Sequence, residues 1–111
     1  MTQNFPFYNR WSAEITVTND QIIDNDYLDL IAQKIISDLK LTVVSKSEHL
    51  FPKYGGQTKV YIISQSHLII HTWPEYSSLH IDLMTCSPGL DTLTVQNVIR
   101  SLPNINQPIF P

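Results

Sequence analysis

Residues 58–86, TKVYIISQSHLIIHTWPEYSSLHIDLMTC, decide the fold of this chain. β-Branched and aromatic residues dominate this stretch, and turn residues divide it into three runs. Three strands are therefore predicted, over Thr58–Gln65, His67–Trp73 and Ser77–Cys86. The Pro74-Glu75 pair leaves only a tight connection between the last two strands, which is too short for a crossover helix. We expect the strands to pair as an antiparallel sheet.

Successive side chains of a strand point to opposite sides, so the sequence also predicts what each side of the sheet carries. One side is apolar and suits packing against helices; it holds Leu68, Ile70, Leu79, Ile81 and Leu83. The other side is rich in chemistry; it holds His67, His71, Trp73, His80, Asp82, Met84 and Cys86. Such a side makes a poor dry core. We expect it to carry a site and to be covered by a second copy of the protein.

Four more elements are predicted outside this stretch. They are a strand over Trp11–Thr18, an amphipathic helix over Asp24–Lys40, a strand over Leu41–Lys46 and a helix over Leu90–Leu102. A flexible loop containing Gly55 and Gly56 precedes Thr58, and a loose tail follows Pro103. This order predicts an α+β fold, a two-layer sandwich in which two helices cover one face of a mainly antiparallel sheet.

The composition predicts a single globular domain over residues 1–111. Hydrophobic residues make up 42% of the chain, and the net charge of -3 argues against nucleic acid as a partner. Cys86 is the only cysteine, which rules out an intrachain disulfide and favours a reducing cytoplasm. No apolar run approaches the length that spans a membrane, so we expect no membrane association.

Three reactive side chains, Ser66, His71 and Cys86, form a motif with a defined spacing. Ser66 begins SHLIIHTWPE, His71 lies five residues beyond it, and Cys86, in DLMTC, lies twenty residues beyond it. This pattern resembles the signature of the small bacterial and archaeal S-adenosylmethionine decarboxylase proenzymes, with weaker similarity elsewhere, including Ala13-Glu14. The resemblance implies an enzyme of that family that cleaves itself between residues 65 and 66.

The resemblance implies a self-generated cofactor. The Ser66 hydroxyl is expected to attack the Gln65 carbonyl and give an ester, with Thr58 at the position of a serine involved in this processing. His71 is then expected to remove the proton from Cα of residue 66, so that β-elimination releases the upstream chain. Hydrolysis of the resulting dehydroalanine leaves a pyruvoyl group on chain 66–111.

The resemblance also implies a substrate and a partner. The pyruvoyl carbonyl is expected to form a Schiff base with S-adenosylmethionine and to accept electrons as carbon dioxide departs. Cys86 is expected to donate the proton that replaces the carboxyl group, Glu75 to hold the ribose hydroxyls and Phe51 to stack on adenine. The product serves spermidine and other polyamine synthesis, and the cleaved chains are expected to form a homodimer.

Departures from the family pattern leave alternatives open. Gln65 stands where glutamate is usual, and Lys59 and Ser87 stand where glycine is usual. These changes permit a pyruvoyl decarboxylase of another amino acid, such as arginine or ornithine, or a relative that never cleaves and acts as a partner or regulator. A zinc site is a further alternative, although its ligands, His67, His71, Asp82 and Cys86, lack a standard spacing. We expect no metal.

Overall fold

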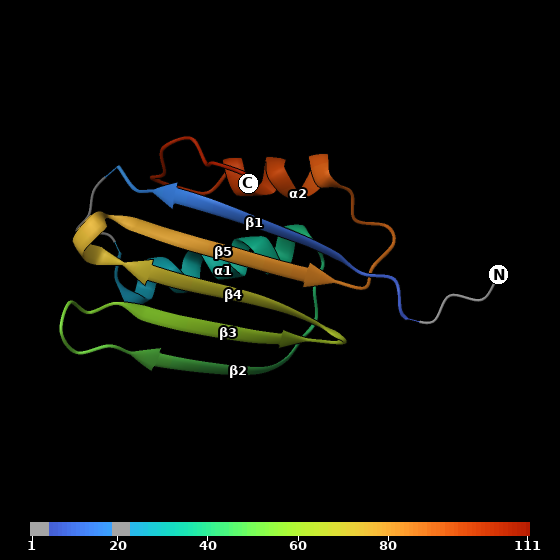
Figure 1. Cartoon of the computed structure of the whole chain (residues 1–111), viewed down its shortest axis with the longest axis horizontal. Coiled ribbons are helices and arrows are strands. Elements are labelled where there is room, and N and C mark those ends of the chain that lie inside the picture. The colour runs from blue at the N-terminus through green and yellow to red at the C-terminus, as the bar shows by residue number, and fades with distance from the viewer. Residues whose placement is uncertain (1–4, 19–22) are drawn as a thin grey trace.

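A computed structural model describes residues 5–18 and 23–111, and it confirms the α+β sandwich. The sheet has five antiparallel strands in the order β1-β5-β4-β3-β2 (Figure 1). The strands are β1 (Asn9–Thr16), β2 (Val43–Leu50), β3 (Gln57–Ile63), β4 (Ser66–Trp73) and β5 (Ser78–Thr85). Helices α1 (Asn25–Asp38) and α2 (Thr92–Arg100) cover one face, and a short helix, η2 (Pro74–Tyr76), connects β4 to β5.

Local sequence signals explain where the two helices begin. The Asp24 carboxylate accepts a hydrogen bond from the backbone N–H of Tyr27 at 2.8 Å, and Asp91 accepts one from Thr94 at 2.7 Å. Both carboxylates satisfy free donors in the first turn and complement the positive end of the helix dipole. The apolar face of α1 then packs on the predicted apolar side of the sheet. The core there includes Leu28, Ile31 and Ile35 of α1 with Leu68, Ile70, Leu79, Ile81 and Leu83 of the sheet.

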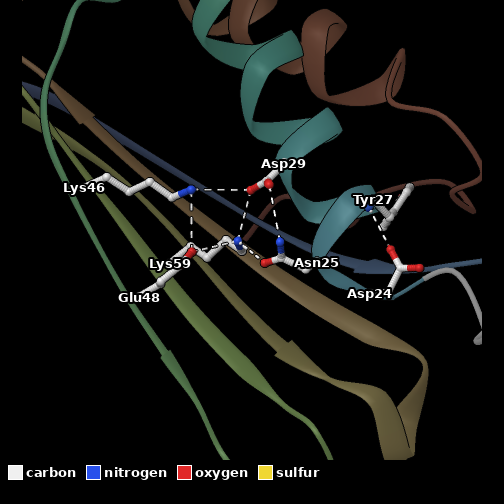
Figure 2. Close-up of polar contacts among 7 residues, drawn as sticks. All are labelled: Asp24, Asn25, Tyr27, Asp29, Lys46, Glu48 and Lys59. Carbon is white, nitrogen blue, oxygen red and sulfur yellow. Dashed lines mark hydrogen bonds and ion pairs between the residues drawn. The ribbon is translucent and has the colours of Figure 1, made fainter.

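One charged residue is buried between the helix and sheet layers. Lys59 on β3 pairs with Ile70 on β4 and so points to the helix side, where none of its side chain is exposed. Its ammonium group donates to Asn25 at 2.6 Å, Asp29 at 3.0 Å and Glu48 at 2.9 Å (Figure 2). Three acceptors offset the loss of water around this charge. The ammonium of Lys59 thus ties α1 and β2 to β3.

The structure corrects two expectations about the ends of elements. The tail after Pro103 is held, not loose: Glu14 and Ile109 exchange two backbone hydrogen bonds of 2.9 Å, and the Tyr27 hydroxyl donates to the Pro103 carbonyl at 2.8 Å. Backbone donors left free along the outer edge of β1 explain this pairing. Strand β3 ends at Ile63, so Gln65 lies in a turn and not in the strand.

Candidate functional site

The turn between β3 and β4 holds the peptide bond between Gln65 and Ser66. Gln65 has a φ of 57°, in the left-handed region, and Ser66 is the first residue of β4. Ser64 and Gln65 form the two-residue loop between Ile63 and Ser66, and a positive φ at the second loop position is usually supplied by glycine or asparagine. A residue other than glycine or asparagine adopts it at a cost of about 1 to 2 kcal/mol. Gln65, which supplies the carbonyl of its peptide bond to Ser66, is therefore strained.

Cys86 contacts both residues of that bond from the end of β5. Its thiol donates to the Gln65 carbonyl oxygen, with sulfur and oxygen 3.1 Å apart, and its backbone N–H donates to the Ser66 hydroxyl oxygen at 3.2 Å. Hydrogen bonds to a carbonyl oxygen polarise it toward nucleophilic attack. We name Gln65, Ser66 and Cys86 the cleavage group. Cavities of about 370 Å³ and 320 Å³ adjoin it on the two sides of the sheet.

A second set of predicted residues meets near the opposite end of β4. Phe51, Thr58, His71 and Glu75 line one cavity of about 400 Å³, and we name them the pocket group. Thr58 and His71 are direct partners across β3 and β4, and Thr58 Oγ1 lies 2.9 Å from His71 Nδ1. This hydrogen bond fixes the plane of the imidazole ring. The structure therefore brings these four predicted residues together.

The environment of His71 leaves it ready to accept a proton. Burial lowers the pKa of the His71 imidazole, nearby His80 lowers it further, and Asp82 opposes both effects. A lowered pKa means that the ring is neutral at pH 7, as a general base must be. The distance between the His71 and His80 ring centroids is 6.2 Å.

The loop before β3 is fixed over this cavity. The backbone N–H of Gln57 donates to the Thr72 hydroxyl at 2.9 Å. Gly56 is packed so closely that a Cβ atom there would lie 3.0 Å from the Thr72 carbonyl oxygen. The exposed rings of Phe51, Tyr54 and Trp73 line the same cavity.

The two groups lie too far apart to act together within one chain. Five residues separate Ser66 from His71 along β4, which at about 3.3 Å per residue is roughly 16 Å. Alternation also places the Ser66 side chain on the helix side of β4, unlike His71. Ser66 therefore points away from the side of the sheet that the sequence predicts to carry a site. The cleavage group and the pocket group therefore lie near opposite ends of β4.

A third polar cluster lies on the open side of the sheet, which is the face that α1 and α2 do not cover. Arg10 donates two hydrogen bonds to the Asp82 carboxylate, at 2.8 and 3.0 Å, and His67 Nε2 lies 3.6 Å from the same carboxylate. The bonds from Arg10 hold the pKa of Asp82 below its ordinary value, although burial opposes them. Across residues 5–18 and 23–111, no three His, Cys, Asp or Glu side chains converge on a point where a metal could bind.

Sequence reasoning missed several residues near these groups. Arg10 and Glu14 face His67, Asp82 and His80 from β1, and Tyr54 lines the pocket. The pairing register of β1 with β5 brings these residues to the site, and alternation within one strand does not reveal a register. A long aromatic in the Gly-containing loop was the only available signal for Tyr54.

Comparison with known proteins identifies the family of this chain. A family model described as S-adenosylmethionine decarboxylase matches residues 9–104. The chain is 39% identical over 80 residues to an S-adenosylmethionine decarboxylase proenzyme of Thermosipho melanesiensis, covering 71% of this chain and 61% of that protein. It is 37% identical over 73 residues to a proenzyme of the same name from Clostridium botulinum strain Loch Maree, covering 66% and 62%.

A solved structure shares the fold. The crystal structure of the adenosylmethionine decarboxylase from Aquifex aeolicus matches with a TM-score of 0.77 and 20% identity, over 96% of this chain and 88% of that one. The chain thus spans about three fifths of the length of the curated relatives and most of the solved domain. With the family model matching most of its length, the chain belongs to the S-adenosylmethionine decarboxylase family.

Proposed function

We propose that this chain is a proenzyme that cleaves itself before Ser66 and then decarboxylates S-adenosylmethionine. The observation that carries the proposal is the contact of Cys86 with both sides of the Gln65-Ser66 bond, at 3.1 and 3.2 Å. A hydroxyl next to a polarised carbonyl in a strained turn suits intramolecular attack. The family and the names of its relatives support the same reaction.

The residues of this chain divide the processing steps among them. Ser66 Oγ attacks the Gln65 carbonyl carbon, the amide C–N bond breaks, and the ester left behind frees the amino group of Ser66. The Cys86 thiol stabilises the negative oxygen that forms during this attack. A neutral His71 removes the Cα proton of residue 66, and the Cβ–Oγ bond of that residue breaks, which releases Gln65 as a carboxylate and leaves dehydroalanine at residue 66. Water then replaces the nitrogen of dehydroalanine, and ammonia leaves.

A homodimer completes the site in this proposal. In a two-fold dimer, if one surface of the first copy contacts a different surface of the second copy, the symmetry repeats that contact with the copies exchanged. An axis that crosses β4 near Ile69 brings the cleavage group of one copy toward the pocket group of the other. Partly exposed apolar side chains surround that point and favour burial by a second sheet; they are Val60, Ile62, Ile69 and Met84. Each chain then supplies Ser66 and Cys86 to one site and Thr58 and His71 to the other.

The pocket group suits a cationic nucleoside as substrate. Phe51 offers an aromatic face for stacking on adenine, and Trp73 lines the same cavity and can attract a sulfonium ion. The exposed Glu75 carboxylate can accept hydrogen bonds from two ribose hydroxyls. The pyruvoyl carbonyl supplies an electrophile for the substrate amine and an electron sink for decarboxylation. Cys86 lies beside that position and donates the replacing proton.

The reaction requires a free thiol, so we propose that the enzyme works in the reducing cytoplasm. We also propose that its product is used in the synthesis of spermidine and other polyamines. No helix in the described part of the chain is long and apolar enough to cross a membrane.

Release of labelled carbon dioxide tests the substrate. Carboxyl-labelled S-adenosylmethionine, arginine and ornithine are supplied separately to the purified chain, with Ser66→Ala as a control that cannot form the cofactor. We expect release from S-adenosylmethionine alone, and Glu75→Gln is expected to raise KM with a smaller effect on kcat. Release of labelled carbon dioxide from arginine or ornithine, and not from S-adenosylmethionine, would show that the proposed substrate is wrong. A cleaved chain that acts on none of the three would contradict the proposed function.

A further inference from the structure

A row of polar side chains crosses the open side of the sheet at the level of His71. Direct cross-strand pairs link one residue from each strand: Glu14 of β1 with His80 of β5, His80 with His71 of β4, His71 with Thr58 of β3, and Thr58 with His49 of β2. Paired residues of antiparallel strands point to the same side. His71 therefore lies between Thr58 and a second histidine.

Contacts fix the orientation of His80. The Glu14 carboxylate bonds to Nδ1 of the His80 ring, which carries the hydrogen of this bond because an ionised carboxylate only accepts. The remaining edge of the ring is free of this contact, and its centroid lies 6.2 Å from that of His71. The other charged groups near the pair are Asp82 and its partner Arg10.

We propose that Glu14 and His80 are positioning residues for His71, with Glu14 orienting the His80 ring and His80 setting the electrostatic environment of the His71 ring across the β4–β5 pair. The inference rests on the proposed function, in which a neutral His71 accepts a proton during self-cleavage. Two imidazolium rings at this distance repel each other, so a charge on His80 weakens the binding of a proton to His71. Burial also favours the neutral form of the His71 ring.

The size of the effect follows from the separation. One unit charge at 6.2 Å, fully screened by water, changes the affinity of His71 for a proton by about half a pH unit. His80→Asn isolates this effect, because the asparagine side-chain N–H replaces Nδ1–H as donor to Glu14 but does not titrate. A purely structural role of His80 is therefore preserved in the variant.

NMR titration of the His71 ring tests the inference without any need for cleavage. The background is the uncut Ser66→Ala chain, and His67→Asn is the matched control, since His67 lies four residues along β4 from His71, at roughly 13 Å, where salt screens its charge. We expect the His71 midpoint to rise by about half a pH unit in H80N and to stay unchanged in H67N. His80→Gln provides a second neutral variant in case H80N does not fold.

Self-cleavage provides the functional readout. With Ser66 present, H80N is expected to shift the acid limb of the cleavage rate upward by the same amount, which is about threefold slower cleavage below the midpoint. An unchanged His71 midpoint in a folded neutral variant would overturn the inference. A parent chain that never cleaves would instead contradict the proposed function and leave the titration result standing.

Discussion

Two inactive variants are expected to restore cleavage to each other when they share a dimer. Ser66→Ala removes the nucleophile but keeps the pocket group, and His71→Ala does the reverse. Each variant alone should stay uncut, because every site in it lacks either the serine or the histidine. Roughly 16 Å separates Ser66 from His71 in one chain, while proton transfer needs heavy atoms about 2.6 to 3.2 Å apart, so the two residues of one site must come from different chains. In a mixed dimer, one site joins the Ser66 of one chain to the His71 of the other.

The yield of this experiment can be worked out. Equal co-expression with random pairing makes about half of all dimers mixed, and each mixed dimer has one complete site. Only the His71→Ala chain carries the serine, so about half of those chains should cleave and none of the Ser66→Ala chains. Intact mass under denaturing conditions distinguishes the two chains by their substitutions. Folded mixed dimers that remain uncut, or a His71→Ala chain that cleaves alone, would refute the shared site.

Three further predictions concern stability and the pocket. Lys59→Met keeps the apolar stem but removes a buried ammonium with three partners, so the free energy of unfolding should fall by about 1.5 to 3 kcal/mol and Tm by roughly 6 to 12 °C. The control Lys46→Met removes a half-exposed ammonium and should cost under about 1 kcal/mol. Equal losses of Tm in the two variants would contradict the role of burial. Gly56→Ala should push the loop away from Thr72 and raise KM for S-adenosylmethionine more than it lowers kcat, whereas Gly89→Ala, in open space, should change neither. Because its pKa is lowered in the folded chain, Asp82 contributes its full stabilisation above about pH 4 and loses it as pH falls through the folded pKa. The Tm difference between the parent and Arg10→Met should therefore shrink below about pH 4. A difference that stays constant with pH would contradict the ion pair between Arg10 and Asp82.

The sheet and helices were predictable because their signals are local. Alternation in β4 and β5 and the helical spacing of α1 each depend on the neighbours of a residue in sequence, and the structure confirms these elements within a few residues. The boundary error at Gln65 has a physical cause: its left-handed conformation is imposed by the hairpin and not by its own preference. The held tail was missed because its backbone pairing with β1 leaves no side-chain pattern.

The candidate site was predictable in membership but not in arrangement. The motif named Ser66, His71 and Cys86, and the cavity also gathers Thr58 and Glu75 with His71. The spacing of Ser66 and His71 in a predicted strand implies their separation, but no sequence pattern shows which other residues gather at each end of β4. Nor does a pattern reveal that Lys59 points between the layers, where acceptors from α1 and β2 surround it.

Intact mass of the purified chain under denaturing conditions, with Ser66→Ala alongside, tests the central claim most directly. Self-cleavage and formation of the cofactor are one chemical event, so the masses report both. We predict two fragments, residues 1–65 and a chain 66–111 that begins with a blocked pyruvoyl group, and a single uncut mass for Ser66→Ala. A single uncut mass for the parent chain would contradict the proenzyme and favour a relative that acts without catalysis.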